Sequence, residues 1–360
     1  MLDYAPPIRP FPTNSLSSSA AAEQPTHDRQ RSDLALSDQM DTKFHAGERA
    51  AQARAGAAPR SPALRDYMPE QHRAFFAALP FVVAATTDAD GWPVATILAG
   101  SPGFVASPDP RTLRIATAPD RDDPAAEWFK AGAQIGLLGI DLATRRRNRA
   151  NGTIAAATDD ALVVAVAQSF GNCPQYIHIR DLRMVAAGRT LPERMDRLDP
   201  PARDAITTTD TLFVATSSGG SGGSKRDGTD AGLGGVDVSH RGGKPGFIRV
   251  DDDTLTIPDF AGNRYYNTLG NLLLDPRAAL LIPDFATGDV LHIQGRTEIV
   301  WDVPAEERLA GAERLWRLHV IRAWCRRAAL PLRWSLRMLS PGVARTGSWQ
   351  TRGPAAMIAS

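Results

Sequence analysis

Two stretches of this chain, about 143 residues apart, repeat one another, and this repeat constrains the architecture more than any other feature. Residues 92–105 and 235–248 share apolar alternations and turn glycines, and Asp-Leu-Ala-Thr at residues 141–144 recurs in register as Asp-Phe-Ala-Thr at residues 284–287. The period is too long for a solenoid and has the size of a whole domain. The sequence therefore predicts a tandem duplication that folds as an internal pseudo-dimer.

Composition limits the class of protein. The 360 residues are enough for two ordinary domains, and a formal net charge of +1 favours neither nucleic acid nor an anionic membrane. Two cysteines, Cys173 and Cys325, are too few for a disulfide framework and fit a reducing compartment. The first residues lack the apolar core of a secretory signal, and no apolar run is long enough for a bilayer. We expect a cytoplasmic protein that binds no nucleic acid and no membrane.

Short apolar alternations with one helical stretch per repeat predict the fold class. Strands are expected from residue 81 onward, with an Asp-Ala-Asp-Gly turn at residues 88–91, and the second repeat follows the same order with a helix at residues 265–274. Many short strands with one helix per unit are typical of a small antiparallel barrel. The sequence thus predicts a mainly β protein with some α (α+β), built from tandem barrels at residues 68–205 and 206–303.

The segments outside the barrels differ in character. Residues 1–40 are rich in Ser, Ala and Pro and predict a disordered arm, followed by an N-terminal helical extension at residues 41–67. Residues 304–360 predict a C-terminal helical tail, because acids come early and arginines late in residues 306–325, as the helix dipole favours. The Gly/Ser-rich insert at residues 217–234 is typical of a flexible linker in a tolerant surface loop, and a lid over a ligand is the alternative.

A candidate anion site lies where a strand of the second repeat ends and a helix begins. Free backbone N–H groups meet the positive end of a helix there, and Asn263, Arg264 and Asn267 add donors suited to phosphate. The alternative is an Asn-capped helix with a solvated arginine. The equivalent loop of the first repeat is acidic, so we expect at most the second loop to bind phosphate; its acids are Asp120, Asp122 and Asp123.

Arginines cluster on one expected strand of the first repeat. Four of the five residues 145–149 are arginine, and the period of a strand places Arg145, Arg147 and Arg149 on one face and Arg146 on the other. Such a run can be a charged edge that prevents strand pairing. A nucleic-acid patch has no support, because aromatic residues are not interleaved. We interpret the run as the partner that completes the phosphate site of the second repeat.

The clearest polar asymmetry between the repeats lies at residues 239–241. His240 and Arg241, which follow Ser239, stand where the first repeat has the apolar Ile97 and Leu98. A lone histidine is more often a satisfied structural residue. Together with two following glycines, however, this segment favours close approach to a polar ligand.

These residues and three motifs resemble the pyridoxamine 5'-phosphate oxidase-like flavoproteins, the FMN-binding split barrels, in a subfamily with two units per chain. The motifs are Phe-His-x-Gly-Glu at residues 44–48, Phe-Gly-Asn-Cys-Pro-x-Tyr-Ile at residues 170–177, and Gly-Asn-x-x-x-Asn-x-Leu-Gly-Asn at residues 262–271. The resemblance implies two tandem split β-barrels and FMN bound at the seam between them.

The resemblance also implies roles for individual residues. His240 is the candidate catalytic residue, Arg333 and Trp334 weakly match a substrate-binding pattern, and no metal is expected. The implied cofactor-binding residues are Arg146, Arg147, Arg149, Ser239, His240, Arg241, Phe260, Asn263, Arg264 and Asn267.

The function implied is that of an FMN-dependent oxidoreductase whose substrate and electron donor the sequence does not name. One alternative is a non-catalytic module that binds flavin or haem, with His178, His240 and His292 as haem candidates. Another is a protein–protein adaptor on a degenerate barrel. The pseudo-dimer could itself pair again as a homodimer.

Overall fold

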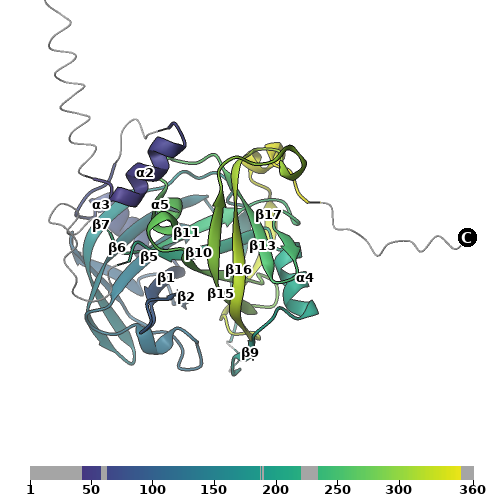
Figure 1. Ribbon diagram of the computed structural model, residues 1–360. Coiled ribbons are helices and arrows are strands. Elements are labelled where there is room, and N and C mark those ends of the chain that lie inside the picture. Colours follow the sequence, from purple (N-terminus) through teal and green to yellow (C-terminus); the bar gives the residue numbers. More distant parts are fainter. Residues whose placement is uncertain (1–42, 58–62, 187, 189, 220–233, 350–360) are drawn as a thin grey trace, which may run out of the picture. The chain divides into compact units, whose positions relative to one another are not determined.

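A computed structural model describes residues 43–57, 63–186, 188, 190–219 and 234–349 (Figure 1). The predicted arm at residues 1–40 and most of the Gly/Ser-rich insert lie outside the described residues. No helix of the described part is long and apolar enough to cross a membrane.

Most of the described chain forms two antiparallel sheets. The first contains β1 (Phe81–Thr87), β2 (Pro93–Ala99), β3 (Val105–Asp109), β4 (Thr112–Ile115), β5 (Gln134–Asp141), β6 (Arg146–Thr158) and β7 (Ala161–Gly171). The second contains β10 (Thr211–Ser217), β11 (Val236–Gly242), β12 (Arg249–Asp251), β13 (Thr254–Phe260), β14 (Arg277–Pro283), β15 (Val290–Val300) and β16 (Ala312–Arg326), with β9 (Glu193–Met195) paired to β16.

The two sheets have the same strand order. The first runs β2-β1-β5-β6-β7-β4-β3 and the second runs β11-β10-β14-β15-β16-β13-β12, so each strand of one sheet has a counterpart in the other. The register agrees as well, because Leu138 faces Arg149 in the first sheet while Leu281 faces His292 in the second. This shared topology confirms the predicted tandem arrangement of two barrel units.

Helices occupy the same places in both units. The helix α3 (Glu70–Ala77) precedes β1 as α4 (Pro200–Thr208) precedes β10, so α4 falls across the expected boundary at residue 205. The loop before β5 holds the short 3-10 helix η1 (Ala126–Trp128), whereas the loop before β14 holds α5 (Asn267–Leu274). The predicted N-terminal helix is α2 (Ala46–Arg54), which packs against α5.

Strand alternation divides the apolar side chains into three cores. On β1, Val82 and Ala84 face the core of the first unit, whereas Val83 faces a third core that both units share. On β10, Val214 enters the core of the second unit and Phe213 enters the shared core. The period of two along a strand therefore buries both faces of β1 and β10, and it joins the units along a continuous apolar seam.

The expected C-terminal helical tail is wrong for residues 306–325. Apart from the short 3-10 helix η2 (Ala305–Glu307), this segment supplies β16, which pairs with β15 on one side and β13 on the other. Leu, Glu and Arg favour a helix locally, but only this strand can take the place that β7 has in the first unit. Pairing on both edges outweighs an intrinsic preference of a few tenths of a kcal/mol per residue. The second unit consequently extends to Arg326 rather than to residue 303.

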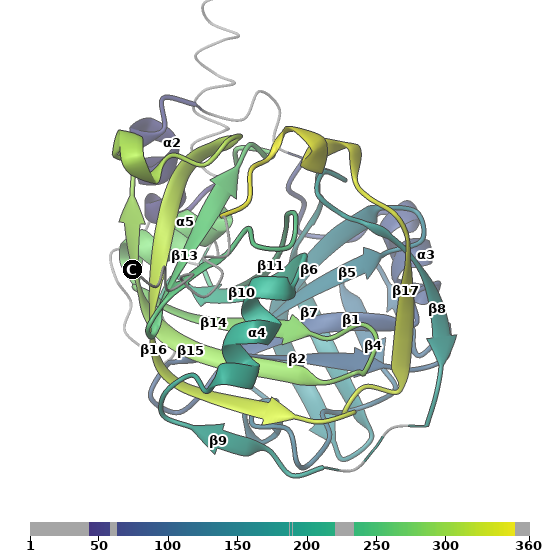
Figure 2. The same ribbon diagram turned by 90° about the vertical axis from the view of Figure 1, so that its right-hand side faces the viewer.

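The remaining elements connect the units at their ends. The strands β8 (Ile179–Met184) and β17 (Leu332–Met338) form a separate two-stranded sheet, which joins segments that follow the first and second sheets. Figure 2 shows this pair at the right of the view, with α4 between it and β16. A last 3-10 helix, η3 (Pro341–Arg345), follows β17.

Candidate functional site

The candidate site lies where β6 of the first unit meets β11 and the β13–α5 loop of the second. On β6, the side chains of Arg147 and Arg149 both reach residues of the second unit. Arg146 points to the other face, where its guanidinium lies 5.1 Å from the ring centroid of Phe75. The predicted division therefore holds for Arg146, Arg147 and Arg149, and Arg146 lies apart from the candidate site. It is wrong for Arg145, which lies in the turn before β6 with a φ of 60° and reaches Met338.

One cavity brings together nine of the ten residues implied to bind the cofactor, all except Arg146. We call this cavity of about 70 Å³ the arginine pocket. Four arginines and two acids line it, which gives it an excess of positive charge. Its full lining is Arg147, Arg149, Asn172, Ser239, His240, Arg241, Asp259, Phe260, Gly262, Asn263, Arg264, Tyr266, Asn267, Thr268, Leu269 and Glu313.

Arg149 connects the two units most extensively. Its Nη1 donates to Asp237 Oδ2 at 2.7 Å and to Asn267 Oδ1 at 2.9 Å, and its Nη2 donates to Ser239. Ser239 in turn lies 2.9 Å from the Thr268 hydroxyl at the start of α5. Arg149 is 6% exposed, so these are buried, charge-assisted contacts of the stronger kind.

Arg147 and His240 form a second contact across the seam. Arg147 Nη1 lies 3.2 Å from His240 Nδ1, and its Nε donates to the carbonyl of Cys173 at 2.7 Å. Burial lowers the pKa of His240 well below its usual value, and the positive charge of the neighbouring Arg147 lowers it further. The imidazole is therefore neutral at pH 7, and because Nδ1 accepts from Arg147, its proton lies on Nε2.

Burial and the neighbouring Arg149 also lower the pKa of Arg147, whose charge no carboxylate pairs directly. Arg241 does have such a partner, because its Nη1 donates to Asp259 Oδ1 at 2.8 Å. The same carboxylate accepts from Arg314 at 2.7 Å, and Arg314 also donates to Glu313 at 2.9 Å, which leaves Arg147 as the arginine of the pocket's buried group without a carboxylate contact. The arginine pocket therefore favours an additional anion.

Four buried donors around the arginine pocket have no hydrogen-bond partner. They are Arg149 Nε, Arg241 Nε, His240 Nε2 and Asn172 Nδ2. An unpaired buried donor costs free energy, so four of them around one cavity require an explanation. A ligand with several acceptor oxygens satisfies all four and also balances the excess of arginines.

The β13–α5 loop has strained backbone beside these donors. Arg264 and Tyr266 adopt φ angles of 62° and 59°, in the left-handed region that residues other than glycine rarely occupy. Tyr265, between them, packs its ring on Phe44 and Phe170, which holds the loop from the opposite side. The resulting turn presents the exposed Arg264 side chain at the start of α5. Such strain is typical of loops that hold a ligand.

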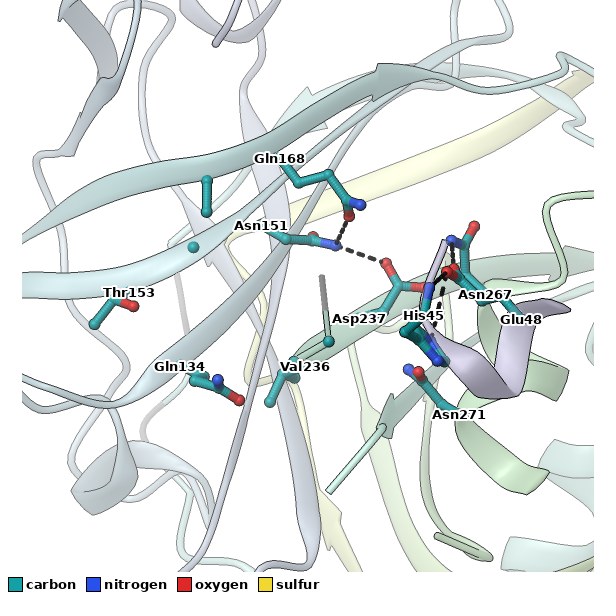
Figure 3. Close-up of a pocket in the computed structure, with 14 residues that line it drawn as sticks. His45, Glu48, Gln134, Asn151, Thr153, Gln168, Val236, Asp237, Asn267 and Asn271 are labelled. Atoms are coloured by element: carbon teal, nitrogen blue, oxygen red, sulfur yellow. Dashed lines mark hydrogen bonds and ion pairs between the residues drawn. The ribbon is translucent and has the colours of Figure 1, made fainter. Parts of the chain in front are cut away.

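A second cavity of about 130 Å³ adjoins the arginine pocket at Asn267, which lines both. We call it the carboxamide pocket, because Gln134, Asn151 and Gln168 line it together with Asn267 and Asn271 (Figure 3). Asn151 Nδ2 donates to Asp237 Oδ1 at 3.1 Å, whereas Gln134 Oε1 and Asn151 Oδ1 have no partner. This pocket therefore offers unpaired acceptors where the arginine pocket offers donors.

Two buried acids border the carboxamide pocket. Glu48, on α2, accepts from Asn267 Nδ2 and from the His45 backbone, as Figure 3 shows. Burial raises the pKa of Glu48 to about 8, and burial also raises the pKa of Asp237 despite its contact with Arg149. Two acids thus share the positive charge of one arginine, so this cluster retains a proton at pH 7.

The pseudo-equivalent place on the other side of the seam is nearly filled. There His292 replaces Arg149 and Gln294 replaces Asn151, and the cavity measures about 20 Å³. Asp123, in the acidic loop, accepts from Thr96 at 2.7 Å and from Arg326 of β16 at 3.1 Å. His292 Nε2 and Arg326 Nε have no hydrogen-bond partner either, but two acids, Asp120 and Asp123, neutralise the one arginine.

Several placements differ from the sequence interpretation. Arg333 donates to the carbonyls of Leu330 and Leu332, and Trp334 packs between Phe81 and Phe285, so neither lines the arginine or carboxamide pocket. Conversely, Asp237, Glu48, Asn172 and Thr268 belong to the site although the sequence interpretation did not select them. One signal was present for Asp237, which interrupts an apolar alternation where the first repeat has Val94.

Comparison with known proteins relates the first unit to one family. Residues 68–191, which span α3 and β1–β8, match the family described as pyridoxamine 5'-phosphate oxidase. The first unit is thus similar to this family. No curated protein matches the chain.

Among solved structures, HupZ of Group A Streptococcus is 17% identical and covers 29% of this chain and 94% of its own, with a TM-score of 0.23. An FAD-binding protein from Mesorhizobium loti is 13% identical and covers 39% of this chain and 99% of its own, with a TM-score of 0.26.

Proposed function

We propose that this chain binds one FMN at its seam and acts as a flavin-dependent oxidoreductase. The observation that carries the proposal is the set of four unpaired buried donors around the arginine pocket, combined with its excess of arginines. The family match of the first unit and the motifs shared with FMN-binding split barrels support a flavin rather than another phosphate ester.

The donor set fits the phosphate of FMN. Arg241, Arg149 and His240 Nε2 would hold the phosphate oxygens, and Arg264 would close the loop over them. The carboxamide pocket, through Gln134, Asn151 and Gln168, offers hydrogen-bonding groups for a heterocycle. Cavities of about 70 and 130 Å³ lie below the roughly 300 Å³ of typical cofactor sites, so binding requires the side chains around Asn267 to move apart.

FMN, when bound, supplies the electron or hydride transfer. The chain itself supplies placement and proton control. His240 is held neutral, with Nε2 as a donor, while Glu48 and Asp237 hold a proton beside the carboxamide pocket. The haem alternative loses one candidate ligand, because both ring nitrogens of His178 are engaged, by Gly243 and by Ser340.

Titration of the full chain with FMN tests the proposal. We expect quenched flavin fluorescence with a stoichiometry of one FMN per chain, and absorbance bands of bound flavin after purification in its presence. Failure to bind FMN, or a Soret band in the purified protein, would show that the cofactor assignment is wrong. Two FMN per chain would leave the cofactor but reject the single-site assignment.

A further inference from the structure

A further cavity of the described part lies away from the seam pockets. It measures about 660 Å³ and shares no lining residue with the arginine or carboxamide pocket. We call it the α4 cavity, because α4 forms one wall while the β14–β15 turn, the end of β16 and β17 form the others. Its size lies within the range of about 300–1,000 Å³ that small-molecule sites occupy.

The repeat explains why the second unit has this space. In the first unit, Phe75 and Phe76 of α3 pack so closely on Gly139 of β5 that an added Cβ would lie 3.0 and 2.9 Å from their rings. The equivalent of Phe75 in α4 is Ala205, whose side chain lines the cavity. The second unit therefore lacks this phenyl ring, and Ile282, which stands where the first unit has Gly139, lines the space instead.

The charge beside the missing ring is reversed as well. In the first unit the guanidinium of Arg146 lies 5.1 Å from the centroid of the Phe75 ring. The residue at the same register position in the second unit is Asp289, a lining residue of the α4 cavity. Where the first unit places a cation over a ring, the second places a carboxylate, which accepts from Arg327 and from the Ala328 backbone.

The other residues that line the α4 cavity also provide apolar surface and carboxylates. Apolar walls come from Ile282, Leu291, Phe285 and Trp334. Five carboxylates and two arginines also line the cavity, and each arginine is paired with one of the carboxylates, Arg180 with Asp210 and Arg327 with Asp289. The other three aspartates have no cation within the lining. Asp199 and Asp284 accept from backbone N–H groups, so Asp204 offers the carboxylate that a positively charged ligand would meet.

We propose that the α4 cavity is a second ligand site, which binds a small compound with an aromatic ring and an ammonium group. The ring lies against the apolar walls beside Ala205, and the ammonium lies towards Asp204. This site is independent of FMN binding at the seam, because the pockets share no residue.

Calorimetric titration of the full chain with phenethylammonium tests the proposal, with 2-phenylethanol and 3-phenylpropionate as neutral and anionic probes. We expect one site for the ammonium, weaker binding of the alcohol and none of the carboxylate, with no change when FMN is present. Absence of heat up to about 1 mM ammonium, equal binding of all three probes, or competition by FMN would overturn it.

Two variants locate the site. Ala205→Phe restores the ring of the first unit and should weaken phenethylammonium binding at least about tenfold. Asp204→Asn removes an exposed carboxylate and should weaken it by about two- to fivefold, while Asp181→Asn, an exposed carboxylate outside the cavity, should not. If Ala205→Phe unfolds the chain, the contrast between the two aspartate variants decides, and equal binding by both rejects the assignment.

Discussion

The two sides of the seam are built from the same repeated sequence but differ in the balance of their buried charges. On one side, Arg147, Arg149 and Arg241 outnumber the acids that contact them, and a cavity of about 70 Å³ remains between them. On the other side, Asp120 and Asp123 surround Arg326, and about 20 Å³ remains. The difference teaches that a duplicated site can be lost by internal neutralisation, without any change of backbone topology.

The arginines themselves come from different strands on the two sides. Arg149 lies on β6, whereas the counterpart of β6 carries His292, and the arginine is supplied instead by β16, which is the counterpart of β7. The buried ion pair has therefore moved by one strand. This shift places Arg326 against the acidic loop itself, where it fills space that the arginine pocket leaves open.

The largest effect is expected when either buried pair is broken. Arg326→Met leaves Asp123 buried without its cation, and Arg149→Met does the same to Asp237, so each should lower the free energy of unfolding by about 3–5 kcal/mol. Urea denaturation measures this loss of stability. FMN titration under conditions in which both variants remain folded then shows which side of the seam binds FMN. Only Arg149→Met should weaken FMN binding. If both variants weakened it equally, the two sides of the seam would not differ in FMN binding.

Arg264 gives the sharper comparison, because the repeat offers a matched control. Arg264→Ala should weaken FMN binding by about 1.5–3 kcal/mol, or roughly ten- to a hundredfold, through loss of a charge-assisted hydrogen bond. Arg121, exposed in the acidic loop one repeat distance earlier, should be replaceable by Ala without effect. Fluorescence titration of both variants measures the contrast. Unchanged affinity in Arg264→Ala would refute the role of the β13–α5 loop.

The repeat allowed most of the fold to be predicted from the sequence, because turn glycines and apolar alternations survive duplication. The sequence prediction was wrong at β16. Its Leu, Glu and Arg residues favour a helix locally, but pairing with β15 and β13 makes the segment a strand. Comparison with the first unit would have corrected this, since a barrel unit without a counterpart of β7 leaves the edges of β13 and β15 unpaired.

The sequence predicted the arginines of the candidate site better than its acids. Arg147 and Arg241 stand out against apolar counterparts, and Arg149 against His292, so sequence comparison finds them. Glu48 and Asp237 become meaningful only when folding buries them beside Arg149, from segments far apart in the chain. The motif at residues 44–48 contains Glu48, and Asp237 interrupts an apolar alternation, but the burial that raises their pKa values is a tertiary property.

Glu48 distinguishes the two sides in a further way that pH reveals. It reaches the seam from α2, which packs on α5, whereas the loop on the other side carries only η1. Its carboxyl is buried among His45 of α2, Asn267 of α5, Arg149 of β6 and Asp237 of β11, and burial raises its pKa from 4.5 to about 8. Between these values the folded chain holds a proton that the unfolded chain has released.

The sign of the effect follows from that proton. The stability that the protonated Glu48 contributes is fully present below pH 4.5, and it falls as pH rises until it is lost above about 8. The slope is at most about 1.4 kcal/mol per pH unit, and the coupling to Asp237 spreads it over a wider range. Glu48→Gln keeps an acceptor for Asn267 and cannot ionise, so its unfolding free energy should change less between pH 6 and 8 than that of the wild type.

Glu127→Gln is the matched control, because Glu127 is an exposed acid in η1 of the other loop. It should keep the pH dependence of the wild type. Urea denaturation at pH 6, 7 and 8 measures all three proteins without any cofactor, so the result does not depend on FMN. A Glu48→Gln profile parallel to that of the wild type would mean that Glu48 is ionised in the folded chain, and that α2 brings a fixed charge rather than a proton to the carboxamide pocket.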